Sequence, residues 1–454
     1  MSPTRRQILH GIGATWGIGQ IELPWPDEDQ VRVFVHPQQE FADTLLDPIL
    51  DIGGELVYTF EHFEFVVAEI PSSQLDVLRN DPMVERVEED EPTGIPSDWM
   101  PDVLDLFDPI TAPDCEAHPA QEPSWGWERI GVADTDQDGS TVAVGILDTG
   151  IESDHCSVSV AGGRDFTRSF SNNDYEDRHG HGTHVAGIVG ATDNEIGVVG
   201  VAPNADLYAV KVLDDTGSGS YSTLIAGIDW CMSEDIEIIS MSLGGAEESD
   251  SLAEAIEAAT AAGHLLICAA GNEGHDNSTD CEDDTMLYPA THDDVLSVVA
   301  MNEDETVAEY SSIGRGIDLL APGTDIRSTY VDNTYAEADG TSMACPFVSG
   351  VAALRWEAHE EDGPGPNAAI AAQLLEGAEP VLRTCAEGEG LVQANPGSTR
   401  SRDDESIPGG NDLPAIDPLP VPDDIAWWAV PGAITGGVAG MYALRRYRRG
   451  DQQE

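Results

Sequence analysis

Residues 141–150 read TVAVGILDTG, an apolar run of strand length that ends at Asp148. Comparable runs recur three times downstream: DLYAVKVL (206–213), IEIISMSL (236–243) and HLLICAAGN (264–272). Helical patterns lie between them, as in SLAEAIEAATAAG (251–263), which Gly263 ends. Strands that alternate with helices predict the α/β class, with a parallel sheet covered by helices on both faces. In such sheets functional groups collect at the carboxyl ends of strands, where Asp148 stands.

The chain is strongly acidic. Its 454 residues include 85 acidic and 20 basic residues, a formal net charge of -65, and Lys211 is the one lysine. Repulsion on this scale opposes compact folding unless dense counterions screen it, so the composition predicts a halophilic protein. Apolar residues still make up 41%, which is enough for a folded core. The lack of a basic stripe argues against nucleic acid as a partner.

Three histidines, His179, His181 and His184, fall within the stretch RHGHGTHVAG (178–187). Glycines flank His181, and the apolar pattern that follows is helical, so His181 is predicted at a helix start with its ring free to face a cleft. We expect His184 to pack locally and His179 to lie in the preceding loop. A metal site on these histidines is the alternative, but the stretch lacks the glutamate of HExxH sites.

Two further stretches carry polar groups at predicted element boundaries. ADGTSMACPFVSGVAAL (338–354) places Ser342 where a helix begins, and backbone N–H groups there favour negative charge on a bound oxygen. On its own, Ser342 is equally well explained as a helix cap. CAAGNEG (268–274) places Asn272 directly after a buried strand, where it is a catalytic amide or a turn residue.

Taken together, DTGI (148–151), HGTHVAG (181–187) and GTSMACP (340–346) resemble the motifs of the subtilisin-like serine proteases, the subtilases. The resemblance covers residues 124–394, and the acidic composition resembles the halolysins. It implies a serine endopeptidase that works through an acyl-enzyme, with Ser342 as nucleophile, His181 as general base and Asp148 orienting the imidazole. Asn272 and the Ser342 N–H would hold the oxyanion.

The resemblance also implies a peptide-binding cleft. Two segments resemble its edges and would pair with an extended polypeptide substrate: Gly217-Ser218-Gly219 and Ser242-Leu243-Gly244. The chemistry requires no cofactor. TDNEIGVVGVAP (192–203) resembles the family's calcium loop, with Asn194 as a candidate ligand, but Ser157 stands where an aspartate usually completes that site. Structural calcium is therefore left open.

Residues 31–92 form a separate small unit before the catalytic region. VRVFVHP (31–37) and HFEFVVAEI (62–70) read as strands and MVERVEED (83–90) as a closing strand, with helices between them. The order β-α-β-α-β suggests an α+β, ferredoxin-like domain. It resembles the subtilase propeptide, which assists folding and plugs the cleft, so the protein is expected as an autoinhibited zymogen. Its maturation site would lie in the linker at 93–123.

The two ends of the chain predict export and attachment to a membrane. Arg5-Arg6 within residues 1–30 resembles a twin-arginine signal, which exports folded proteins. A proline-rich acidic stalk (395–424) leads to an uncharged stretch at 425–444 that is long enough to span a bilayer. The basic tail (445–454) would lie in the cytoplasm, leaving the enzyme outside. The stretch could alternatively be a sorting signal that is removed.

The seven cysteines show no CxxC pairing, which argues against a zinc site. Cys268 and Cys345 lie in apolar contexts and are expected as buried thiols, with one disulfide among the others if the chain is exported. Two other classes of function compete with the protease: a subtilase shell kept as a peptide-binding surface protein, and a metallohydrolase built on the histidine cluster. The presence of all four chemical positions favours the enzyme.

Overall fold

The computed structural model describes residues 29–38, 45–95, 102–103, 115, 119–167, 174–274, 284–359, 366–382 and 385–395. The predicted stalk, membrane span and basic tail lie outside these ranges, as does nearly all of the predicted signal region. Within the described ranges, no helix combines the length and apolar character needed to cross a bilayer.

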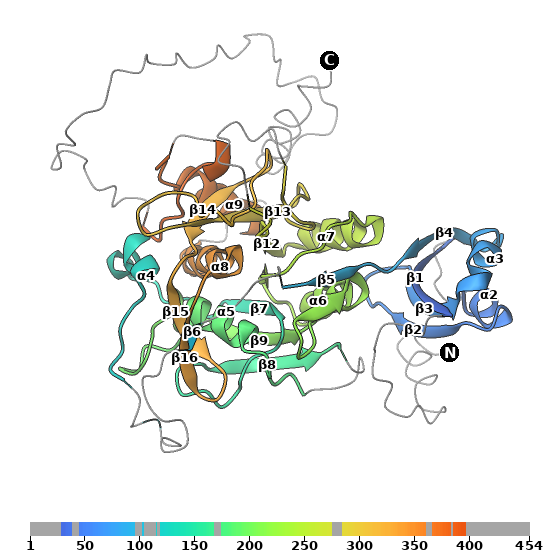
Figure 1. Ribbon diagram of the computed structural model, residues 1–454, viewed down its shortest axis with the longest axis horizontal. Coiled ribbons are helices and arrows are strands. Elements are labelled where there is room, and N and C mark those ends of the chain that lie inside the picture. The colour runs from blue at the N-terminus through green and yellow to red at the C-terminus, as the bar shows by residue number, and fades with distance from the viewer. Residues whose placement is uncertain are drawn as a thin grey trace, which may run out of the picture.

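Seven parallel strands form the central sheet (Figure 1). In spatial order they are β14 (Leu319–Pro322), β13 (Val295–Met301), β12 (Leu265–Ala269), β11 (Ile238–Met241), β7 (Ala143–Asp148), β9 (Asp206–Lys211) and β8 (Val160–Asp165). Each pair of neighbours is parallel. The predicted α/β class with a parallel sheet is confirmed.

Helices cover both faces of this sheet. Alternate side chains of each strand point to opposite faces, so the strands contribute to two hydrophobic cores. In β7, Val144 and Ile146 enter one core and Leu147 the other. The first core packs against α5 (His181–Gly190), α8 (Thr341–Glu357) and α9 (Pro366–Glu376). The second packs against α6 (Tyr221–Ser233) and α7 (Asp250–Ala262).

The N-terminal domain, residues 30–90, is a four-stranded antiparallel sheet with two short helices. Along the chain its elements are β1 (Gln30–Pro37), α2 (Leu46–Asp51), β2 (Glu55–Thr59), β3 (Val66–Pro71), α3 (Leu75–Arg79) and β4 (Val84–Glu89), with η2 (Ser72–Gln74) before α3. The predicted order β-α-β-α-β is therefore wrong by one strand, and the β-α-β-β-α-β order is the ferredoxin-like one. The missed strand, β2, was hard to recognise because its side chains are half-buried or exposed and alternate weakly.

The two faces of the N-terminal sheet pack differently. One face, with Val33 and Val35, closes a small core of its own with α2 and α3. The other face carries a cluster of phenylalanines that joins the α6 and α7 core of the large domain: Phe34, Phe60, Phe63 and Phe65. Apolar burial therefore fastens the N-terminal domain to these two helices, as its position beside them in Figure 1 indicates.

Smaller elements complete the described fold. They are β5 (Pro92–Gly94) paired with β10 (Ser218–Ser220), the sheet β15 (Ile326–Tyr330), β16 (Thr334–Ala338) and β6 (Asp102–Val103), and the helical turns α4 (Trp125–Arg129), η4 (Val132–Asp134) and η5 (Cys385–Glu387).

A disulfide joins Cys115 to Cys156. Cys268 and Cys345 are buried free thiols, as predicted.

Candidate active site

Asp148 and His181 meet at the carboxyl edge of the central sheet. Asp148 is the last residue of β7, and His181 is the first residue of α5. Nδ1 of His181 lies 2.8 Å from Oδ1 and 2.9 Å from Oδ2 of Asp148, and both side chains are fully buried. Because carboxylate oxygens accept hydrogen bonds, the ring donates to Asp148 through Nδ1–H, which leaves Nε2 as the acceptor of a neutral imidazole. The ring is thus held in the tautomer that a general base needs.

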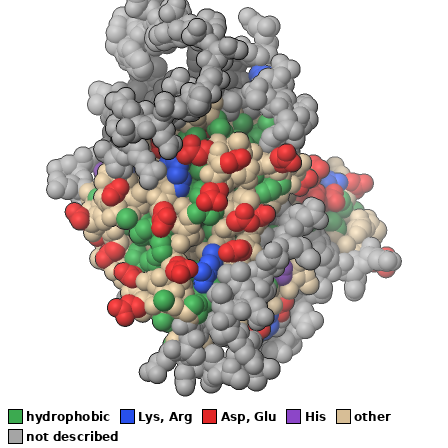
Figure 2. Space-filling model, turned by 60° about the vertical axis from the view of Figure 1, so that its left-hand side comes forward, with side chains coloured by type: hydrophobic (Ala, Val, Ile, Leu, Met, Phe, Trp, Pro, Cys, Tyr) green, Lys and Arg blue, Asp and Glu red, His purple; other side chains and the backbone are tan. Residues whose placement is uncertain are grey.

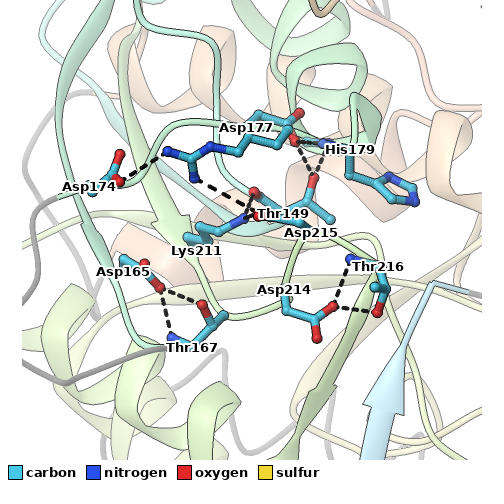
Figure 3. Close-up of polar contacts among 12 residues, drawn as sticks. Thr149, Asp165, Thr167, Asp174, Asp177, His179, Lys211, Asp214, Asp215 and Thr216 are labelled. Carbon is cyan, nitrogen blue, oxygen red and sulfur yellow. Dashed lines mark hydrogen bonds and ion pairs between the residues drawn. The ribbon is translucent and has the colours of Figure 1, made fainter. Parts of the chain in front are cut away.

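A buried carboxylate that the sequence reasoning missed, Asp177, fixes the turn before α5 (Figure 3). Its oxygens accept the backbone N–H groups of His179, Gly180 and Thr183, and the hydroxyls of Thr183 and Thr149. Thr149 follows Asp148 directly in the chain. Asp177 therefore connects the turn that carries the carboxylate to the turn that carries the histidine. Among 85 acidic residues, the only signal for Asp177 was its place four residues before His181.

The chain's one lysine is buried next to the same turn. Lys211 ends β9 and pairs in register with Asp148. Its ammonium group donates to the carbonyl oxygen of Thr149 and lies 3.0 Å from a carboxylate oxygen of Asp215 (Figure 3). A buried ammonium needs such partners. Lys211 thereby joins the turn after β7 to the loop after β9.

The other two histidines of the cluster have different surroundings. Nε2 of His184 lies 3.1 Å from the carbonyl oxygen of Ala336, and complete burial lowers the pKa of His184 to about 3. His179 lies in the loop before α5, where burial, and next the neighbouring His181, lower its pKa. His179 lies in the loop, as expected from sequence, whereas His184 does not bond locally as expected: its partner Ala336 belongs to a distant strand.

Only one group of three side chains in the described ranges lies close enough to hold a metal ion: Glu257, His292 and Asp294. None of the three clustered histidines belongs to it. Nδ1 of His292 already accepts the backbone N–H of Asp294, at 3.1 Å.

Ser342 is the second residue of α8 and is 1% exposed. Its Oγ donates to the carbonyl oxygen of Ser242 at 3.3 Å, and Oγ of Ser242 donates to the carbonyl oxygen of Ser342 at 2.9 Å. This reciprocal pair fixes the start of α8 against the predicted cleft edge. The N–H groups of a helix's first turn have no partner within the helix, so they favour a negatively charged oxygen there.

Asn272 follows β12 and is attached to the start of α8. Its Oδ1 accepts the backbone N–H and the hydroxyl of Thr341, at 3.0 and 2.9 Å. With Oδ1 engaged, the amide presents Nδ2 as a donor. A Cβ added to Gly340 would lie 3.3 Å from Nδ2, so this donor is adjacent to the first residues of α8.

Of the predicted catalytic residues, Asp148 and His181 are hydrogen-bonded to each other, whereas Ser342 and Asn272 share the start of α8, where Asn272 bonds Thr341. The first pair is centred on the start of α5 and the second on the start of α8, and these two helices pack against each other. Asp148 ends β7, Ser342 contacts Ser242 just after β11, and Asn272 follows β12. These three strands are parallel neighbours, so the carboxylate with its imidazole, the hydroxyl and the amide lie at the same edge of the sheet. Such a set is suited to acyl transfer.

A short piece of the N-terminal part of the chain, here called the inserted segment (residues 91–95), lies between the two predicted cleft edges. Its strand β5 pairs antiparallel with β10, with Gly94 opposite Ser218. On the other side, Gly94 and Gly244 exchange both backbone hydrogen bonds, at 3.1 and 3.0 Å. The next residue, Ile95, donates its N–H to the carbonyl oxygen of Gly217.

The two predicted edges therefore receive an extended peptide through backbone atoms. Gly219 also pairs with the inserted segment, opposite Thr93. The side chain of Leu243 is buried in the α6 and α7 core, while Ser242 contacts Ser342 as described above.

Comparison with known proteins decides the family. The model of the subtilase family matches residues 139–399, more than half of the chain. The chain belongs to the subtilase family. This subtilase is 40% identical to subtilisin NAT of Bacillus subtilis subsp. natto over 313 residues, which cover 69% of this chain and 76% of that protein. It is 46% identical to subtilisin DY of Bacillus licheniformis over 216 residues, covering 48% and 77%.

A third relative covers more of this subtilase. The thermostable alkaline protease of Halalkalibacterium halodurans is 36% identical over 331 residues, which are 72% of this chain and 81% of that protein. Family membership and these relatives identify a serine endopeptidase that acts on polypeptides.

Proposed function

We propose that this subtilase hydrolyses peptide bonds through Ser342, His181 and Asp148. The Ser342 hydroxyl attacks the peptide carbonyl while Nε2 of His181 takes its proton, because a free hydroxyl is a weak nucleophile. Asp148 holds the ring through its Nδ1–H and stabilises the imidazolium that forms. His181 then gives the proton to the leaving amine, and water releases the acyl-enzyme by the same route. No step requires a metal or a cofactor.

The tetrahedral intermediate needs donors for its negatively charged oxygen. We propose Nδ2 of Asn272 and the backbone N–H of Ser342. The support for Asn272 is that Thr341 occupies its Oδ1, which leaves the other end of the amide as a donor. The support for the Ser342 N–H is its place in the first turn of α8.

We infer that the protein is made as an autoinhibited zymogen, with residues 31–92 as its propeptide. One observation carries this proposal: the inserted segment pairs with both cleft edges as a third extended strand. Backbone pairing of this kind is how sheets bind extended peptides. A segment that already makes these bonds excludes a substrate, and cleavage in the linker at 93–123 on the N-terminal side of the disulfide-bonded Cys115 would release it.

Docking of the N-terminal domain supports the same proposal. Glu88 accepts the backbone N–H and hydroxyl of Ser251 at the start of α7, at 2.9 and 2.6 Å. Asp90 accepts the same two groups of Ser222 at the start of α6, at 2.9 and 2.7 Å. Carboxylates stabilise helix N-termini, where backbone N–H groups lack partners. The N-terminal domain therefore completes two helices of the catalytic domain.

We also propose that the enzyme is exported and works in concentrated salt, outside the cell membrane. The support is the net charge of -65 together with the wide spread of acidic side chains and the few basic ones on the face in Figure 2. Export rests on the paired arginines at 5 and 6, and anchoring on the uncharged stretch at 425–444.

The test is Ser342→Ala, produced and assayed in concentrated salt. This variant should show no caseinolysis and should keep its N-terminal domain, while the parent loses that domain by a cut within 93–123 that precedes Cys115. Ser349→Ala, a buried serine two turns along the same helix, is the matched control and should mature and cleave. Caseinolysis or self-processing by Ser342→Ala would show that another residue is the nucleophile.

A further inference from the structure

The loop that resembles the family's calcium loop has its carbonyl oxygens engaged by protein donors. Nε2 of Gln121 donates to the carbonyl oxygens of Thr192 and Val198, each at 3.0 Å. The hydroxyl of Ser157 donates to the carbonyl oxygen of Ile196 at 3.4 Å. Three carbonyls of one loop, which would otherwise be available to a cation, therefore accept hydrogen bonds from uncharged groups.

Asn194, the candidate ligand predicted from sequence, is engaged at both ends of its amide. Its Nδ2 donates to the carbonyl oxygen of Cys156 at 2.9 Å, and its Oδ1 accepts the N–H of Ile196 at 3.2 Å. A carbonyl requires a donor and an N–H requires an acceptor, so only this orientation of the amide satisfies both. Rotating Oδ1 towards a cation would break both bonds.

These residues do not fit a calcium ion. Calcium takes six to eight oxygen ligands and favours carboxylates. At the position where an aspartate usually completes the site, the buried hydroxyl of Ser157 hydrogen-bonds instead to the hydroxyl of Tyr335, at 2.8 Å. The amide of Gln121 faces the carbonyls with hydrogens and not with its oxygen.

A covalent bond lies at the same place. Cys156, whose carbonyl oxygen accepts from Asn194, forms the disulfide with Cys115. A few residues further along the chain, Ala120 bridges Ile196, and Gln121 donates its backbone N–H to the carbonyl oxygen of Glu195. The disulfide therefore joins the part of the chain that leads to Gln121 to Cys156, which contacts the loop through Asn194.

We propose that the loop at 192–198 is held by Gln121, Ser157 and the Cys115–Cys156 disulfide in place of a calcium ion. The shape of the loop then depends on an oxidised disulfide and not on free calcium. This inference concerns stability, and it does not depend on which residues carry out catalysis.

The test measures the melting temperature of full-length Ser342→Ala protein, which should not digest itself, in concentrated salt. Melting is recorded with excess calcium and with excess EDTA, for this protein and for the same protein carrying Asn194→Ala. Calcium bound at another site would also change the melting temperature. We therefore compare, between the two proteins, how far EDTA lowers the melting temperature relative to calcium. We expect the same shift in both proteins. A larger shift in the protein that retains Asn194 would place a calcium ion in the loop and overturn the proposal.

The disulfide is tested in the same background with Cys115→Ser. The bond closes a separation of 41 residues, so its loss should lower the melting temperature by on the order of 10 °C, with or without calcium. If this variant does not fold, dithiothreitol added to the folded parent should give the same drop. An unchanged melting temperature after verified reduction of the bond would contradict the proposal.

Discussion

Gly94 of the inserted segment and Gly244 of the cleft edge exchange two backbone hydrogen bonds, at 3.1 and 3.0 Å. The approach is close on the side of the other edge. A Cβ added to Gly94 would lie 2.9 Å from the carbonyl oxygen of Gly217. Glycine at position 94 lets the segment lie directly against this edge, so the fit of the segment is sensitive to a single methyl group.

Gly94→Ala should therefore weaken autoinhibition. The methyl group would force the inserted segment away from Gly217, and its bonds to both edges would lengthen. We expect a shorter lag before caseinolysis begins when the purified zymogen is diluted into assay buffer. Ser73→Ala, an exposed change on the N-terminal domain, is the control and should keep the parent's lag. An equal lag in all three proteins would mean that this pairing does not limit activation.

Asn272→Ala should lower kcat with little change in KM, because the proposed donor acts on charge that develops only in the transition state. Removal of subtilisin's own asparagine donor costs about 10²–10³ in kcat, and we expect a similar loss. Thr341→Val is the control for position, because it removes the hydroxyl that donates to Oδ1 and accepts the N–H of Gly271, and leaves Nδ2 in place. If Thr341→Val loses as much activity as Asn272→Ala, Asn272 acts by supporting the helix start and not as a donor.

We predict that the contact of His36 with the catalytic domain is sensitive to acid. Its buried ring lies 2.8 Å from Oγ of Ser251 in α7, and Arg86 donates to it at 2.9 Å. A carboxylate oxygen of Glu254 lies 3.6 Å from Nδ1, and the ring contacts that of Phe65 in a tilted arrangement. Burial, and next the cation of Arg86, lower the pKa of His36 to about 3.

Arg86 belongs to the same domain as His36, so the part of the lowering that depends on docking is the burial against α7. That part stabilises the docked state at neutral pH, where the ring is uncharged in both states. That contribution is lost as the pH falls from about 6.5 towards 3. In the Ser342→Ala background, docking should therefore weaken by up to about tenfold per pH unit in this range, and adding His36→Gln should reduce the slope. Domain separation can be followed by limited proteolysis at matched salt. Asp90, whose pKa burial raises to about 6, acts in the opposite direction but is present in both proteins. Equal slopes would contradict the assignment to His36.

The parts of the structure that follow from local patterns were predictable from sequence. The apolar run ending at Asp148 predicts a buried strand, and glycines around His181 predict a helix that starts beside a cleft. The two cleft edges were predicted from their resemblance to the family, and their backbone pairing depends little on side chains.

The remaining parts depend on contacts between distant segments. Asp177 is one carboxylate among many; four of its hydrogen bonds lie within its own turn, and the one from Thr149 forms only when the turns at 149 and 177–183 meet. The pairing of Cys115 with Cys156 was left open because spacing alone does not select partners. Strand β2 was missed because its side chains contact both the N-terminal core and solvent.

The most direct test of the proposed catalytic row is to locate covalent labelling by a serine-directed phosphonate. The mature parent, kept in concentrated salt, is treated with the probe, digested and mapped by mass spectrometry. A single label is expected on Ser342, and His181→Ala, which removes the base, should react far more slowly. A label on another serine, or undiminished labelling of folded His181→Ala, would contradict the account.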